Sequence, residues 1–226
     1  MNTIIIYHGS TKVIDKPTYG YGKIYNDYGQ GFYCTKNLEL AKEWACSDNV
    51  FGYANKYELD ITDLKVLDLS SKKYTVLNWI ALLLDNRIVN LPTPLQMKAR
   101  DYLIKNFLPD YKNYDVIFGY RADDAYFQFA RAFIANEISL SQLALAMKLG
   151  KLGYQYCLKS KKAFQRLKFI GYEEADPEIY YNRKKIRDEE ARNTFLKELE
   201  NDDMDGIYLR DIIKEEMKND DQRLRL

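Results

Sequence analysis

The chain has 226 residues, and a hydrophobic content of 46% is enough for a domain with a sizeable core. Its 34 basic and 33 acidic side chains leave a net charge of +1, which gives no overall attraction toward nucleic acid or an anionic membrane. This balance argues against a DNA-binding protein that acts mainly through its charge.

No segment approaches the roughly 20 apolar residues that a membrane-spanning helix needs. The N-terminal MNTIIIYHGS also lacks the basic start of a signal peptide. The three cysteines, Cys34, Cys46 and Cys157, and the single histidine are not spaced as metal ligands. We therefore expect a cytoplasmic, reduced protein that holds no metal and has no membrane partner.

The first part of the chain is expected to hold two short strands separated by a long loop. Residues 3–7 form a β-branched run that meets a turn at the sequence HGS, and residues 31–35 form a second run. Residues 11–31 are rich in Gly and Tyr without a clean period, which predicts a long loop and, within a compact domain, a functional one. A helix follows from Leu38, with Asn37 as its N-cap.

The middle of the chain alternates between strand-like and helix-like patterns. Alternating or β-branched runs predict strands over residues 53–59, 65–69, 114–120 and 154–160. Apolar residues at helical spacing predict helices over residues 73–87, 94–108, 125–136 and 139–149. Ser139 and Gln142 match a capping box at the start of the last of these helices.

From about residue 172 the sequence becomes dense in charge and loses its strand-like runs, except at residues 206–209. Residues 176–200 begin with Asp-Pro and predict a charged helix, because proline is favourable at the first helical position. We therefore expect a strand-rich domain over residues 1–172 and a charged helical extension over residues 173–226. The extension is either a solvated helical face or a docking site for a partner, with residues 206–209 as a buried anchor.

Three short pieces of the sequence point to a binding site. The only histidine, His8, lies in YHGS, Tyr33 follows two glycines in DYGQGFYCT, and Gln155 lies within the strand-like YQYCLKS. A polar residue at a core-facing strand position costs free energy unless it is paired, and a ligand is one possible partner. Taken singly, each piece has an ordinary structural explanation: a satisfied histidine, turn glycines or strand packing.

Together and in this order, the three pieces resemble the signatures of the ADP-ribosyltransferases related to diphtheria toxin and the poly-ADP-ribose polymerases. YHGS resembles the end of their first strand, YGQGFYCT with NLELAKEWA their aromatic strand and helix, and GYQYCLKS their third signature strand. The resemblance covers residues 7–45 and 150–160 well and the C-terminal extension not at all. It implies an α+β fold with a split, mixed or antiparallel β-sheet and flanking helices.

The resemblance also implies a role in NAD binding for each matching residue. His8 would form a hydrogen bond with a ribose hydroxyl, the Gly9 backbone would hold the nicotinamide amide, and Ser10 would add a further hydrogen bond. Tyr33 would stack on the nicotinamide ring, and Gln155 would contact the 2′-hydroxyl of the nicotinamide ribose.

Gly31, directly before the aromatic strand, is counted with the NAD-binding residues on the same resemblance. Gln155 departs from the Glu that is common at the third signature. A glutamate would place a full negative charge beside the oxocarbenium-like cation formed when the nicotinamide bond breaks, whereas Gln155 offers only a dipole and hydrogen bonds. Single-unit transfer is therefore expected rather than chain elongation.

Two carboxylates in GYRADDAYF offer a possible replacement for that charge. Asp123 and Asp124 precede a helix, where a carboxylate suits the positive end of the helix dipole. They either cap this helix, or one of them is a catalytic residue that supplies the negative charge which Gln155 lacks.

The activity implied by the resemblance is mono-ADP-ribosylation, with NAD as substrate and a protein or nucleic acid as acceptor. The same motifs also resemble a bacterial family associated with toxin–antitoxin-like gene pairs, which implies a toxin with an antitoxin as partner. Two alternatives stay open: an NAD glycohydrolase, in which water replaces the acceptor, and a catalytically silent module that binds NAD or a partner protein.

Overall fold

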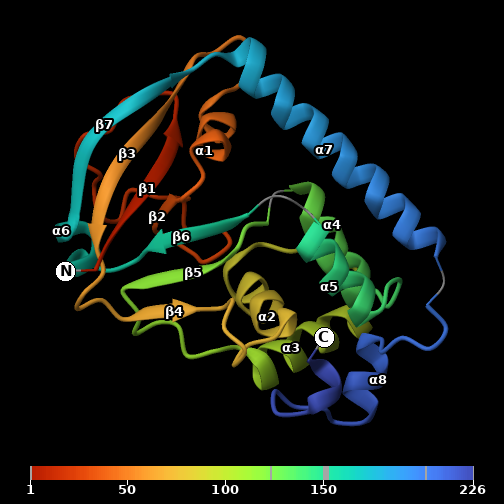
Figure 1. Cartoon of the computed structure of the whole chain (residues 1–226). Coiled ribbons are helices and arrows are strands. Elements are labelled where there is room, and N and C mark those ends of the chain that lie inside the picture. Colours follow the sequence, from red (N-terminus) through yellow and green to blue (C-terminus); the bar gives the residue numbers. More distant parts are fainter. Residues whose placement is uncertain (1, 123, 150–152, 202, 226) are drawn as a thin grey trace.

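Two β-sheets form the centre of an α+β fold, with helices packed around them (Figure 1). The computed structural model describes residues 2–122, 124–149, 153–201 and 203–225, with the backbone alone at residues 124–126, 148 and 149. The expected α+β class, with a split sheet and flanking helices, is confirmed.

The first sheet is antiparallel, in the order β1-β3-β7, with strands β1 (Thr3–Ser10), β3 (Gly52–Asp60) and β7 (Leu167–Ala175). The second sheet is mixed, in the order β2-β6-β5-β4, with strands β2 (Phe32–Cys34), β6 (Tyr154–Leu158), β5 (Val116–Tyr120) and β4 (Val66–Asp68). Its β4–β5 pair is parallel and its other pairs are antiparallel.

The sheets meet at an isolated bridge between Tyr7 of β1 and Thr35 after β2. The Tyr7 N–H donates to the Thr35 carbonyl at 2.7 Å, and the Thr35 N–H donates to the Tyr7 carbonyl at 2.9 Å. From His8 onward, β1 pairs only with β3, so the two sheets split apart after Tyr7. The candidate site lies at this split.

Two features of the first sheet differ from the expectation. The predicted turn at HGS is wrong, because His8, Gly9 and Ser10 continue β1 and pair with Asn55, Ala54 and Tyr53 of β3. Neither β7 nor α6 (Lys161–Gln165) was predicted. β7 is an edge strand rich in charge, so the hydrogen-bonded ladder to β3 fixes it more than its own apolar pattern does.

The predicted helices are confirmed, with small shifts at their ends: α1 (Leu38–Ala45), α2 (Val76–Asn86), α3 (Pro94–Phe107), α4 (Asp124–Ile134) and α5 (Leu140–Leu149). Asn37 caps α1 through its side-chain oxygen, which accepts from the Leu40 N–H at 3.2 Å. The capping box of Ser139 and Gln142 is also present. The almost wholly apolar α2 lies buried in the larger core, while α1 packs on β1.

The C-terminal segment folds back onto the rest of the molecule (Figure 1). It comprises α7 (Pro177–Glu200), which packs on α1 and α4, α8 (Leu209–Lys214), which packs on α3, and η1 (Gln222–Leu224). Leu209 and Ile212 are fully buried in the larger core, so this segment is not only a solvated face. In the described part of the chain, no helix has both the length and the apolar character needed to cross a membrane.

Candidate functional site

A pocket of about 220 Å³ opens where β1, β2 and β6 meet the loop that precedes β2. It brings together His8, Tyr33 and Gln155, the three residues singled out in the sequence motifs. Its described lining is completed by residues of β1, of the loop, of α1 and of the segment after β5: Gly9, Asn26, Asp27, Trp44, Arg121 and Ala122.

His8 is half-buried and held in a fixed orientation. Its Nδ1 lies 2.7 Å from the Tyr33 carbonyl oxygen, and its ring stacks on Phe32 with centroids 4.2 Å apart. Burial lowers the pKa of His8, against the smaller opposing effect of the carbonyl. Because a carbonyl only accepts, the neutral ring carries its proton on Nδ1 and presents Nε2 as an acceptor.

Gly9 allows β1 and α1 to approach each other closely. A Cβ atom at this position would collide with the Ala41 carbonyl oxygen and lie 2.8 Å from the Ala45 nitrogen. Backbone groups alternate in direction along a strand, and those of Tyr7 face Thr35 rather than β3. The Gly9 N–H and C=O therefore face the same way, toward the split between the sheets.

Tyr33 ties β2 to the preceding loop. Its hydroxyl donates to the Gly29 carbonyl at 2.6 Å and accepts from the Tyr28 N–H at 2.9 Å. The Tyr28 and Tyr33 rings lie nearly parallel, with centroids 6.4 Å apart. Burial raises the pKa of Tyr33 far above its ordinary value, so the hydroxyl stays protonated and keeps this contact.

Ser10 and Gly31 are not in the described lining of the pocket. Ser10 is the last residue of β1, and its hydroxyl accepts from the Lys12 N–H at 3.2 Å. Gly31 packs against β6, where a Cβ would lie 2.8 Å from the Leu158 carbonyl oxygen. Both therefore have a structural explanation in the protein alone.

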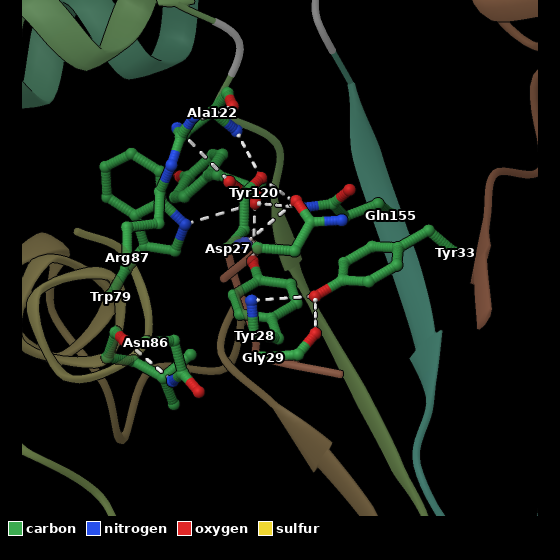
Figure 2. Close-up of polar contacts among 12 residues, drawn as sticks. Asp27, Tyr28, Gly29, Tyr33, Trp79, Asn86, Arg87, Tyr120, Ala122 and Gln155 are labelled. Atoms are coloured by element: carbon green, nitrogen blue, oxygen red, sulfur yellow. Dashed lines mark hydrogen bonds and ion pairs between the residues drawn. The ribbon is translucent and has the colours of Figure 1, made fainter. Parts of the chain in front are cut away.

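Gln155 contacts the carboxylate of Asp27, which is the first residue of the piece DYGQGFYCT but was not singled out as a candidate from the sequence. Its Nε2 donates to Oδ2 of Asp27 at 2.8 Å and to the Tyr120 carbonyl at 3.3 Å (Figure 2). Both side chains are buried, each with 3% of its surface exposed. The polar residue within β6 is thus paired inside the protein, with a carboxyl group directly beside it.

Asp27 is held by three different elements. Its Oδ2 also accepts from the Ala122 N–H at 2.9 Å, and Nη1 of Arg87 lies 3.4 Å from its Oδ1 (Figure 2). Burial raises the pKa of Asp27, and the Ala122 N–H and the Arg87 charge oppose this. The sequence indicated only that the loop is functional, since nothing in its pattern distinguishes Asp27 from its neighbours.

Asp123 lies outside the described residues, as do residues 150–152 at the start of the third motif. Asp124 is the first residue of α4, and its side chain is not described. Among the side chains that the structure describes, the carboxylate in contact with Gln155 is that of Asp27.

Trp44 and Arg121 also line the pocket. The Arg121 guanidinium lies over the Trp44 ring, 4.2 Å from its centroid. This cation–π contact holds a positive charge close to the Asp27 carboxylate, where it favours the ionised form of that group. The lining of the pocket therefore combines one buried carboxylate with the Arg121 cation.

A comparison with known families gives one match. The model of a family described as "Protein of unknown function (DUF3990)" matches residues 4–169, which include His8, Tyr33 and Gln155 and end within β7. No curated protein matches the chain, and no solved structure does. Helices α7 and α8 lie outside the matched region.

Proposed function

The chain belongs to the family of proteins of unknown function described as DUF3990, and we propose that it is a mono-ADP-ribosyltransferase that cleaves NAD and transfers ADP-ribose to a macromolecular acceptor. The observation that carries the proposal is that His8, Tyr33 and Gln155, far apart in the sequence, line one pocket. Their motifs resemble, in the same order, the three signatures of NAD-binding transferases.

The pocket suits the nicotinamide end of NAD. At about 220 Å³ it is smaller than the roughly 300–1,000 Å³ of pockets that enclose a whole drug-sized ligand. A carboxamide needs one donor and one acceptor, which the Gly9 N–H and C=O supply, while Nε2 of His8 accepts from a ribose hydroxyl. The phosphates would then lie near the Arg121 guanidinium.

Asp27 supplies the charge for bond cleavage. When the bond between C1′ of the ribose and the nicotinamide nitrogen breaks, its electron pair goes to the nicotinamide, and positive charge develops on the ribose. A fixed carboxylate in a buried site stabilises such a cation strongly. The acceptor then attacks C1′ and loses its proton. Gln155 positions Asp27 through the 2.8 Å hydrogen bond.

The test is nicotinamide release and transfer of label from adenylate-labelled NAD, with and without cell lysate. We expect release and labelling by the wild type, and their loss in His8→Ala, Tyr33→Ala and Gln155→Ala. Tyr172→Ala, an exposed tyrosine of β7 outside the pocket, serves as the matched control. Release without labelling would identify an NAD glycohydrolase, and the absence of both from a folded protein would overturn the proposal.

One observation favours a second candidate, a catalytically silent module that binds NAD or a partner. The Gln155 amide is already engaged by Asp27, and Arg87 lies within 3.4 Å of the same carboxylate. A site in which these polar groups already pair with one another would bind NAD or a partner without cleaving NAD. Calorimetry that shows NAD binding, with nicotinamide release at background, would support this candidate.

A role as the toxin of a toxin–antitoxin pair is a further proposal and rests on the resemblance. If the acceptor is essential to the cell, expression of the wild type would arrest growth, and expression of His8→Ala would not. Growth that is unaffected by wild-type protein at the same level would count against a toxin. An antitoxin would be recognised as a protein that restores growth and binds the chain directly.

A further inference from the structure

A row of aromatic rings lies on β5 and β6. The rings follow one another from Tyr120 to Tyr154, Phe118 and Tyr156, with centroids 5.0, 5.1 and 4.5 Å apart and interplanar angles of 26°, 30° and 35°. Strand alternation places Tyr154 and Tyr156 on the face of β6 opposite to Gln155. The row is therefore distinct from the candidate NAD site.

Two pockets adjoin at this row. One, of about 410 Å³, lies over Phe118, Tyr154 and Tyr156, and the other, of about 440 Å³, lies between β4, α2 and the C-terminal segment. Tyr120 and Met147 line both. We call the two pockets together the aromatic groove. Tyr154 is 39% exposed, so part of this side chain reaches solvent.

Cations lie at both ends of the aromatic groove. At one end Nζ of Lys36 lies 5.5 Å from the Tyr156 ring centroid. At the other end Lys72 and Arg225 line the second pocket, and the Arg225 guanidinium donates to the Lys72 carbonyl, which holds the two residues together. All three side chains are exposed.

The described lining of the aromatic groove contains no acidic residue, although 33 of the chain's 226 residues are acidic. The nearest carboxylate along the chain from the second pocket is that of Asp68, and it accepts hydrogen bonds from the Ser70 N–H and hydroxyl. The groove is therefore locally positive in a protein that is nearly neutral overall.

We propose that the aromatic groove binds single-stranded nucleic acid. Aromatic faces that stack on bases, flanked by cations that contact the backbone, are the features that such ligands require. Bases stack on the row through Tyr154, and phosphates contact Lys36 at one end and Lys72 and Arg225 at the other. A duplex keeps its bases stacked inside and offers no free base face to the row.

The experiment measures fluorescence anisotropy of a 5′-labelled strand of roughly 12 nucleotides, as oligo-dT and as oligo-rU, with the full chain and without NAD. Tyr154→Ala is expected to weaken binding about tenfold or more, whereas Tyr154→Phe keeps the ring and the affinity. Lys36→Gln and Lys72→Gln are each expected to lower the salt-dependence slope by about 0.7.

The matched controls are Tyr21→Ala and Lys98→Gln, both exposed and outside the aromatic groove, which should bind as the wild type does. The oligo-dT and oligo-rU arms distinguish DNA from RNA. Binding of a duplex or of polyphosphate as tight as that of the single strand would overturn the proposal. So would a dissociation constant weaker than about 100 µM for both strands, or binding unchanged in Tyr154→Ala. Since NAD is absent, none of these outcomes depends on the transferase activity.

Discussion

The Asp27 carboxylate lies 2.8 Å from the Gln155 amide nitrogen, although 128 residues separate them in the sequence. This contact joins the loop before β2 to the strand that carries the third motif. It places a carboxyl group beside a glutamine that has none of its own. The candidate site therefore depends on Asp27, which begins the piece DYGQGFYCT but was not among the candidate residues.

Replacing Asp27 with asparagine tests whether the charge of the carboxylate is catalytic. Asp27→Asn keeps the shape of the side chain and an oxygen for the Ala122 N–H, but it removes the charge that would stabilise the cation. We expect nicotinamide release to fall by about 100-fold or more, with NAD binding by calorimetry within a few-fold of the wild type.

The matched control is Asp124→Asn at the first residue of α4, because asparagine would replace an aspartate whose only role is to cap the helix. Loss of release in Asp124→Asn but not in Asp27→Asn would return the catalytic role to the carboxylates before α4. Asp123→Asn, tested in parallel, shows whether the other carboxylate before α4 is needed for nicotinamide release.

The three motifs and their order could be predicted from the sequence, because strand patterns and a lone polar residue within β6 are local signals. Asp27 could not, because only the fold brings Arg87 of the α2 end and Ala122 after β5 to its carboxylate. The same holds for β7, whose place depends on the ladder to β3. Of the two interpretations that the sequence left open for the extension, one made residues 206–209 a buried anchor, and Leu209 is buried there.

Changing Gln155 to glutamate should destabilise the protein in a pH-dependent way. Gln155→Glu places a second carboxylate beside Asp27 in a buried site, which raises the pKa of the new group. A raised pKa in the folded state means that stability is lost as pH rises above the unfolded value of about 4.3. We expect a loss of about 1–3 kcal/mol at pH 7, and less near pH 4.5.

Thermal unfolding at both pH values measures this difference. Gln96→Glu at the third position of α3 is the matched control, since its side-chain oxygen accepts from the Thr93 N–H and a glutamate keeps that acceptor. Equal stability of Gln155→Glu and the wild type at pH 7 would mean that Asp27 is not charged beside Gln155.

The lowered pKa of His8 can be measured directly, because it is the only histidine in the chain. Burial disfavours the imidazolium, so the ring should remain neutral at pH 7 and titrate below its ordinary value of about 6.5. The unfolded chain then binds a proton that the folded chain does not, and stability is lost as pH falls below 6.5.

Proton NMR of the single ring C2–H resonance gives the pKa, and denaturant unfolding at pH 7.5 and 5.5 gives the stability. The part of the pH dependence that is due to His8 should be absent from His8→Gln. A measured pKa at or above 6.5 would contradict the half-buried, neutral ring.

Gly9→Ala should separate β1 from α1. The new methyl group would collide with the Ala41 carbonyl and lie 2.8 Å from the Ala45 nitrogen and 2.9 Å from Cβ of Trp44. Backbone atoms cannot rotate away, so one element must shift, at a cost of about 1–3 kcal/mol. For a chain of this size that lowers Tm by roughly 2–4 °C per kcal/mol. Ser10→Ala, on the same strand, should leave Tm nearly unchanged.

Leu209→Ala tests whether the C-terminal segment belongs to the core. Leu209 begins α8 and is fully buried, so its truncation should cost about 2–5 kcal/mol in the free energy of unfolding. Met204→Ala removes a side chain that is 82% exposed and should have little effect. A single unfolding transition at lower denaturant would show that the segment unfolds together with the sheets. An unchanged main transition in Leu209→Ala would mean that the segment detaches independently and that the family-matched region, which ends at residue 169, folds without it.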